Sequence, residues 1–389
     1  MIPTVRAGID VFLADMAHRL RGKRVGLITN QTGVTSGLEG NIEAFQRLFG
    51  DGLCALFGPE HGLYGHIQDR ERIKNLIDPE SGLPVYSLYG PEESPAEAVL
   101  HELDMLVFDI QDVGVRFYTY LTSMYYMLKA AATIGVPVMI LDRPNPITGT
   151  RITGPIMNTA LTSFEGACDI PIRHGMTLGE LALFLNDKNG LGAQVEVVPM
   201  TGWKRTMWYE DTGLPWVSPS PNMPTVDTAV LYPGMCLFEG TNLSEGRGTT
   251  RPFELIGAPW IESNRLASAL NDRKLSGVRF RAAHFLPTFW KLQGIACHGV
   301  QVYVTDREIF EPFTTSLAMI DQILELWPDE FQWTRVDDDT RYFFDRLVGN
   351  DQIRQLLMQR IPIEDIIESY QDHENRFLIH RRPFLLYNA

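Results

Sequence analysis

Glu60 and His61 place an acid and a base side by side directly after an apolar run that ends at Phe57. Burial against apolar neighbours favours the protonated form of a carboxyl group, which suits a general acid. His61 is suited to relay a proton or to hydrogen-bond a substrate hydroxyl. The alternatives are that Glu60 caps the next segment or pairs with an arginine, and that His61 is structural.

Three other apolar runs of the N-terminal half also end in polar residues. Asp112 follows the run that ends at Phe108 and is a candidate to orient the substrate. Arg116 follows it closely, and its alternative role is to neutralise the acids around it. The other candidate ligand-binding residues at these run ends are Asn30, Asp109, Gln111, Arg143 and Asn145.

A second polar cluster lies at 238–254, where three glycines and several threonines make a helix unfavourable and predict a loop. Loops on rigid scaffolds often carry binding and catalytic residues. The alternative is a loop tied by its own salt bridges. Its candidate residues are Glu239, Asn242, Glu245, Arg247 and Arg251, with Glu245 considered for a catalytic role.

The four apolar runs predict strands that are buried on both faces, as in a parallel sheet covered by helices. Ligands of such sheets bind beyond the carboxyl ends of the strands, so the polar residues should converge on one edge. The strands containing Val25, Leu56, Val107 and Ile140 should be parallel neighbours. The four runs are Arg24–Thr29, Leu53–Phe57, Met105–Phe108 and Val138–Leu141.

Helical periodicity between these runs predicts a Rossmann-like, doubly wound α/β domain with a mostly parallel sheet. The predicted helices are Asn41–Phe49, Pro95–Glu102, Tyr118–Ile134 and Thr177–Asn186, the last with a Thr177–Glu180 capping box.

Gly213–Pro224 carries four prolines in twelve residues and predicts a domain crossing. We therefore expect a Rossmann-like domain at 1–215 and a smaller α+β domain at 216–389. In the second domain the patterns predict strands at Val278–Phe285 and Val300–Val304, and helices at Ile309–Leu326, Asp351–Arg360 and Ile363–Phe377.

The formal net charge of −14 argues against a nucleic-acid partner. Four scattered cysteines predict buried thiols rather than disulfides or a zinc site. No apolar run is long enough to span a bilayer, and the first residues lack a signal-peptide pattern, so a cytoplasmic location is expected.

The turn after the first strand lacks the GxGxxG fingerprint, and the chain contains no phosphate loop, HExxH helix or GxSxG elbow. No cofactor and no metal are therefore expected. A metal-dependent hydrolase using His61, His66, Asp109 and Asp112 is a weaker alternative, because these residues lack a compact ligand spacing.

Several long motifs resemble those of the bacterial exo-β-N-acetylmuramidases, a family formerly known only as a bacterial domain of unknown function. The resemblance extends from about Gly8 to Tyr387, and the matching segments are 58–62, 106–120, 141–146, 172–181, 218–224 and 237–254. These segments add His174 and Asn222 to the candidate substrate-binding residues. The resemblance implies a Rossmann-like domain and a second domain with a cleft between them.

The resemblance also implies an enzyme that releases terminal, non-reducing N-acetylmuramic acid from peptidoglycan fragments in cell-wall recycling, with Glu60 as the catalytic glutamate. Glycosidases usually need two carboxyl groups, and Asp112, Glu239 and Glu245 compete with the substrate's own acetamido group for the second role. N-acetylmuramic acid differs from N-acetylglucosamine by a lactyl ether that carries a carboxylate. Selectivity for it requires a cation, for which Arg143, Arg247 and Arg251 are candidates. The alternative is a protein that binds muropeptides or cell-wall sugars without cleaving them.

Overall fold

The computed structural model describes residues 5–68, 71, 75–89, 97–336 and 341–388, and the chain divides into two compact units. The first unit comprises Met1–Arg151, His174–Pro224 and His380–Ala389, and the second comprises Ile152–Arg173 and Thr225–Ile379. This division differs from the two consecutive domains expected from the sequence. Residues 152–173 belong to the second unit and residues 380–389 belong to the first. Both assignments depend on long-range contacts, which local composition does not reveal.

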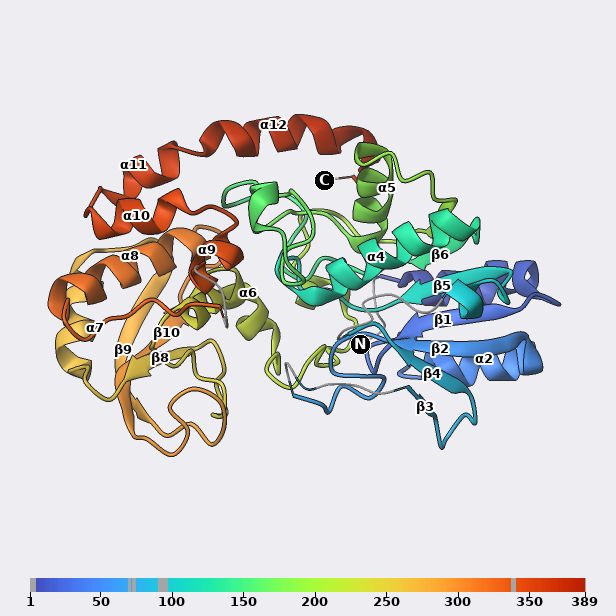
Figure 1. Cartoon of the computed structure of the whole chain (residues 1–389), viewed down its shortest axis with the longest axis horizontal. Helices are drawn as coiled ribbons and strands as arrows, with labels where there is room; N and C mark the ends of the chain where they lie inside the picture. Colours follow the sequence, from blue (N-terminus) through green and yellow to red (C-terminus); the bar gives the residue numbers. More distant parts are fainter. Residues whose placement is uncertain (1–4, 69–70, 72–74, 90–96, 337–340, 389) are drawn as a thin grey trace. The chain divides into compact units, whose positions relative to one another are not determined.

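The first unit contains a seven-stranded sheet in the order β3-β4-β2-β1-β5-β6-β7, in which only the β3–β4 pair is antiparallel (Figure 1). The predicted parallel arrangement of the four central strands is confirmed: β1 pairs with β2 and β5, and β5 pairs with β6. The strands are β1 Val25–Thr29, β2 Leu53–Gly58, β3 Leu76–Ile77, β4 Pro84–Ser87, β5 Met105–Asp109, β6 Val138–Leu141 and β7 Val195–Val198.

Helices flank this sheet, with α4 and α5 packed together on one face and α2 on the other (Figure 1). The predicted capping box is confirmed, because Thr177 accepts from the Glu180 N–H and Glu180 accepts from the Thr177 N–H. α3 is shorter than the predicted helix, whose first two residues lie outside the described part of the chain. The helices are α1 Gly8–Val11, α2 Asn41–Phe49, α3 Glu97–Leu100, α4 Thr119–Ile134 and α5 Leu178–Lys188.

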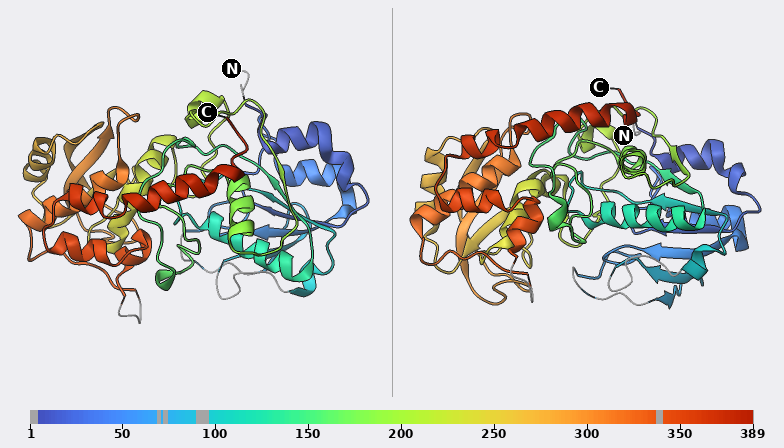
Figure 2. Two further views of the ribbon diagram at one scale, coloured as in Figure 1. Left: turned by 90° about the horizontal axis from the view of Figure 1, so that it is seen from above. Right: turned by 45° about the horizontal axis from the view of Figure 1, so that its top comes forward.

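The second unit contains a three-stranded antiparallel sheet in the order β8-β10-β9, and α7 packs on β9 and β10. The two long strands can be followed as the orange hairpin in Figure 2. The strands are β8 Leu255–Ala258, β9 Val278–Phe285 and β10 Cys297–Val304. The prediction of an α/β domain followed by a smaller α+β domain is confirmed.

The helices of the second half are α6 Val226–Met235, α7 Ser263–Asp272, α8 Pro312–Leu326, α9 Phe343–Val348, α10 Gln352–Met358, α11 Ile363–Glu368 and α12 Gln371–Arg381. The prediction of a single helix at Ile363–Phe377 was wrong, because the helix is interrupted after Glu368, where α11 ends, and α12 begins at Gln371. Ser369 lies at this break and its hydroxyl donates to the Ile366 carbonyl at 2.6 Å. Such local side-chain bonds compete with helix continuation.

Short 3₁₀ and π turns complete the chain: η1 Phe12–Met16, η2 Ala17–Leu20, η3 Gly50–Gly52, η4 Thr159–Leu161, η5 Tyr209–Thr212, η6 Cys236–Gly240 and η7 Arg382–Phe384. The prediction that the whole segment 238–254 is a loop was wrong at its start. There the η6 turn contains Glu239.

The main core of the first unit is built by apolar side chains from the central strands together with Phe12, Phe45 and Val198. All four cysteines are free thiols, of which Cys168, Cys236 and Cys297 are buried and Cys54 is half-buried. Within the described residues, no helix combines the length and the apolar character needed to cross a membrane.

Candidate active site

The parallel order β2-β1-β5-β6 brings the carboxyl ends of four strands to one edge of the sheet. Glu60 follows β2 by two residues, Asp109 ends β5, and Asp142 follows β6 directly. The predicted common edge for these three acids is therefore confirmed, since each strand points the same way as its neighbour.

Glu60 is buried, with 7% of its surface exposed. Its Oε2 accepts a hydrogen bond from the Thr119 hydroxyl at 2.7 Å, and Thr119 is the first residue of α4. The positive end of a helix dipole favours a negative charge at this place. Thr119 therefore fixes the orientation of the Glu60 carboxylate.

Two tyrosines next to Thr119 were not among the residues predicted to form the site. Burial, and then the nearby Asp112 and Glu60 carboxylates, raise the pKa of Tyr118 well above its usual value of 10. The rings of Tyr118 and Tyr120 make an edge contact with centroids 4.8 Å apart, and the Tyr120 hydroxyl donates to the Pro219 carbonyl. Tyr118 lies in the same β5–α4 connection as Asp112, and Tyr120 lies in the first turn of α4, so their closeness to Asp112 in the sequence was the available signal.

His61 lies in a strained turn beside Glu60. Its φ of +71° lies in the left-handed region, which non-glycine residues rarely adopt and which is enriched at functional sites. Nδ1 lies 2.7 Å from the Ile67 carbonyl oxygen, and because a carbonyl only accepts, Nδ1 carries the proton. In the neutral ring this leaves Nε2 as an acceptor, as a proton relay requires.

Asp112 is buried and its two oxygens differ in their partners. Oδ2 accepts from the Gly114 N–H at 2.7 Å and lies 3.7 Å from His174 Nε2. Oδ1 is buried and has no hydrogen-bond partner among the residues that the structure describes. A buried carboxylate oxygen without a donor is costly, so it indicates a place for a ligand donor or an ordered water.

Asp109 and Arg143 form a buried ion pair, and both side chains also hydrogen-bond to other groups of the protein. Arg143 Nε lies 2.6 Å from Asp109 Oδ1, and Asn41 donates to Asp109 Oδ2 at 2.8 Å. Arg143 Nη2 also donates to the Val34 carbonyl at 2.9 Å. Burial acts to lower the pKa of Arg143, but the Asp109 carboxylate outweighs burial and raises it. This pair therefore holds the sheet edge together.

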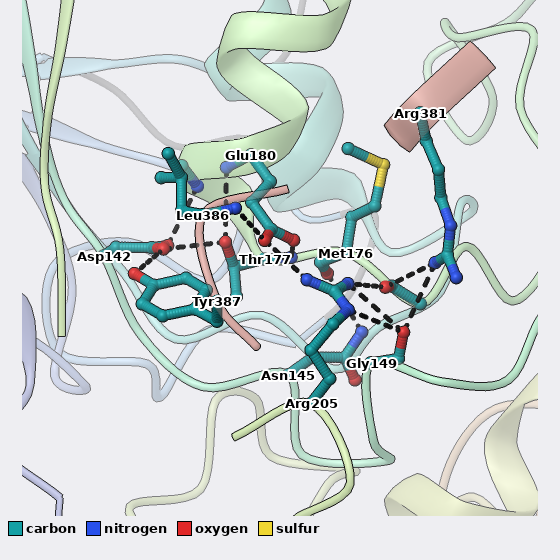
Figure 3. A network of polar contacts seen from close by, with 12 residues as sticks. Asp142, Asn145, Gly149, Met176, Thr177, Glu180, Arg205, Arg381, Leu386 and Tyr387 are labelled. Atoms are coloured by element: carbon teal, nitrogen blue, oxygen red, sulfur yellow. Dashed lines mark hydrogen bonds and ion pairs between the residues drawn. The ribbon is translucent and has the colours of Figure 1, made fainter. Parts of the chain in front are cut away.

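The predicted amide residues of the first unit also make structural bonds. Asn30 Oδ1 accepts from the Thr32 N–H at 2.9 Å, and Gln111 Nε2 donates to the carbonyls of Asp112 and Pro144 at 2.7 and 2.8 Å. Asn145 Nδ2 donates to the Met176 carbonyl at 3.0 Å (Figure 3), whereas Asn222 Nδ2 makes a long contact of 3.4 Å with Gln68 Oε1. Contact of these amides with a substrate stays a prediction.

The second predicted cluster lies in the second unit, and its charged side chains form ion pairs with one another and with Lys291. Arg247 Nη1 lies 2.7 Å from Glu239 Oε1 and 3.2 Å from Glu245 Oε1, while Lys291 Nζ lies 2.7 Å from Glu245 Oε2. Burial acts to raise the pKa of Glu245, but the charges of Lys291 and Arg247 outweigh it and lower it. Glu245 is thus an ionised, fully buried carboxylate with two cations against it.

Asn242 and Arg251 are tied to their own surroundings in different ways. Asn242 Nδ2 donates to the Glu330 carbonyl at 2.8 Å, and its Oδ1 accepts from the Gln332 N–H at 3.0 Å. Arg251 pairs with Glu254 at 3.1 Å, but 52% of its side chain is exposed. Of the two arginines in this cluster, Arg251 has the more exposed side chain.

No group of three or more His, Cys, Asp or Glu side chains in the described residues has the geometry to hold a metal ion.

Comparison with known proteins gives matches over nearly the whole chain. The family models described as the N-terminal and C-terminal parts of the exo-beta-N-acetylmuramidase NamZ match residues 25–227 and 230–387. The chain is 48% identical over 385 residues to the peptidoglycan beta-N-acetylmuramidase NamZ of Bacillus subtilis strain 168, covering 99% of this chain and 92% of that protein.

Two crystal structures of DUF1343 family proteins from Bacteroides fragilis NCTC 9343 have the same fold. One superposes with a TM-score of 0.92 at 36% identity and covers 100% of both chains. The other has a TM-score of 0.77 at 32% identity and covers 99% of both chains. The resemblance inferred from the motifs is confirmed, and the chain belongs to the exo-beta-N-acetylmuramidase NamZ family.

Proposed function

We propose that this protein is an exo-acting glycosidase that releases terminal N-acetylmuramic acid from the non-reducing end of peptidoglycan fragments during cell-wall turnover. Family membership supports the substrate class. The observation that carries the chemistry is the buried Glu60 carboxyl group, held by Thr119 at an edge of the sheet where a ligand of an α/β protein binds.

Glu60 is the proposed general acid, which protonates the oxygen of the leaving sugar. His61, with Nε2 available as an acceptor, is the proposed proton relay beside it. Asp112 is the best candidate for the second carboxylate, because its Oδ1 has no partner among the described residues. Glu245 is less suitable, since Arg247 and Lys291 neutralise it.

Selectivity for muramic acid requires recognition of its lactyl carboxylate, for which an arginine is the suitable residue. Arg143 and Arg247 are buried against carboxylates, with side-chain exposures of 8% and 9%. Arg251, with its half-exposed side chain, is therefore the preferred candidate of the three.

The test is to incubate the protein with a disaccharide that ends in N-acetylmuramic acid and with its counterpart that ends in N-acetylglucosamine, and to follow the released sugar. Release from the first substrate and much less from the second is expected. If neither is cleaved while both bind, the protein is a cell-wall sugar-binding protein instead.

A further inference from the structure

Arg381, the last residue of α12, is buried in the first unit with 5% of its surface exposed. Its Nη1 donates to the carbonyls of Gly175 at 2.7 Å and His174 at 3.1 Å. It also donates to the Gly149 carbonyl at 3.3 Å (Figure 3). Two of these three carbonyls belong to the turn that contains His174. A residue near the end of the chain thus holds a turn 207 positions earlier in the sequence.

The turn at 174–176 has little freedom to move. Gly175 has a φ of +60°, and a Cβ built on it would lie 2.7 Å from Arg381 Nη1 and 2.6 Å from the Arg151 carbonyl oxygen. On its other side, Asn145 donates to the Met176 carbonyl at 3.0 Å. Only glycine fits this position, so the backbone of the turn is fixed against the Arg381 guanidinium.

The same turn sets the tautomer of His174, which is fully buried. The Met176 N–H donates to His174 Nδ1 at 3.2 Å, so Nδ1 is the acceptor of the ring and Nε2 carries the proton. Nε2 faces Asp112 Oδ2 at 3.7 Å, which is longer than a hydrogen bond, while the Gly114 N–H donates to Oδ2 at 2.7 Å. The His174 ring therefore packs its N–H side against Asp112, and Oδ1 has no partner among the described residues.

Arg381 makes no ion pair within the described part of the chain, and a second arginine lies next to it. Arg205 Nη2 shares the Gly149 and Gly175 carbonyls with Arg381, while Arg205 Nη1 pairs with Glu180 at 2.6 Å. Burial, and then repulsion by Arg205, lower the pKa of Arg381 to about 10. Burying a cation without a direct ion-pair partner costs free energy, and the hydrogen bonds from Arg381 to the three carbonyls offset that cost.

We propose that Arg381 is a positioning residue for the active site: it fixes the turn at 174–176, and through His174 it orients Asp112. This inference rests on the proposed function, because Asp112 is taken to act on the substrate there. Arg381 itself touches no reacting atom. It acts on the rate of the chemical step through the placement of another side chain, for which small displacements have large effects.

The test compares kcat and KM of the full-length wild-type protein with those of Arg381→Ala, His174→Ala and the double variant, on the muramic-acid-terminated disaccharide. Each single variant should lower kcat roughly ten- to a hundredfold with little change in KM. The double variant should be no worse than His174→Ala alone, because Arg381 acts through His174. Added guanidinium ion at millimolar concentration should partly restore kcat of Arg381→Ala and not that of His174→Ala.

Two variants of the same C-terminal segment serve as controls. Arg382→Ala removes an exposed neighbouring cation and should leave kcat unchanged. Tyr387→Phe removes the hydroxyl that donates to Asp142 at 2.5 Å, and should lower the melting temperature while kcat is retained.

Wild-type kcat in Arg381→Ala would overturn the proposal, as would fully additive losses in the double variant. A kcat loss in Tyr387→Phe equal to that of Arg381→Ala would also overturn it, because general loosening of the segment would then suffice. Failure of the proposed function is a separate outcome, since the wild-type protein would then cleave no muramic-acid substrate.

Discussion

The Thr119 hydroxyl donates a hydrogen bond to Glu60 Oε2 at 2.7 Å and thereby joins the end of β2 to the start of α4. The two residues come from neighbouring layers of an α/β fold, a sheet edge and a helix N-terminus. This bond gives the Glu60 carboxyl group one defined orientation at the edge of the sheet where the parallel strands end.

Replacing Glu60 by Gln should lower kcat by roughly a hundredfold or more, because general acid catalysis typically contributes that much. The amide keeps the shape of the side chain, so folding and ligand affinity should be retained. Steady-state kinetics and ligand titration measure the two effects. Glu97→Gln, on the exposed surface of α3, is the matched control. Near-normal turnover in the Glu60 variant would remove this residue from the mechanism.

Replacing Thr119 by Val removes the hydroxyl and keeps a branched side chain of similar volume. The Glu60 carboxyl group then loses a charge-assisted hydrogen bond, and kcat should fall about tenfold, equivalent to about 1.4 kcal/mol. Thr119→Ser, which keeps the hydroxyl, should retain most of the activity. Equal losses in both variants would show that the methyl group, rather than the hydrogen bond, matters.

Arg247 and Arg251 should differ strongly in their effect on stability when replaced by Ala. Arg247→Ala removes a cation from two buried carboxylates and should cost about 3–5 kcal/mol. Arg251→Ala removes a half-exposed cation from the buried Glu254 carboxylate and should cost less, about 1–2 kcal/mol. Denaturant unfolding measures both. If Arg251 binds the lactyl carboxylate, Arg251→Ala should also narrow the preference for muramic acid over glucosamine, and an unchanged ratio of kcat/KM values would refute that role.

Glu374 should make stability decrease as the pH rises from about 4.5 to about 7. Burial raises its pKa from the usual 4.5 to about 7 in the folded chain, so the folded state holds the proton over a range in which the unfolded state has lost it. Oε1 accepts from the Gly154 N–H at 2.8 Å, and Gln can keep that bond.

In Glu374→Gln this contribution disappears, and the variant should gain about 1 kcal/mol over wild type above pH 7, after a discount for partial exposure. At pH 4 the two proteins should be nearly equal. Thermal unfolding across this pH range measures the difference, and a pH-independent difference would exclude Glu374 as its source.

Treatment with a chelator should leave activity unchanged, since the described residues contain no group with metal-binding geometry. The assay is the release of muramic acid before and after incubation with excess EDTA and removal of the chelate. Activity that disappears and returns with added Zn²⁺ or Mg²⁺ would favour the metal-dependent alternative.

The sequence by itself determined the order of the elements and the place where chemistry was to be expected. Continuous apolar runs specify strands that are buried on both faces, and parallel strands necessarily bring their carboxyl ends to one edge. The sequence pattern alone therefore places Glu60 at this edge. The capping box of α5 was equally readable, because it depends on residues only three positions apart.

Only the tertiary structure decided which polar residues are used within the protein and which can meet a ligand. Asp109 and Asp112 are close in the sequence, yet Asn41 and Arg143 occupy the first and leave Oδ1 of the second without a partner among the described residues. The link from Arg381 to His174 joins residues 207 positions apart. Such pairings depend on the distances and directions of side chains in the folded chain, and no local pattern encodes them.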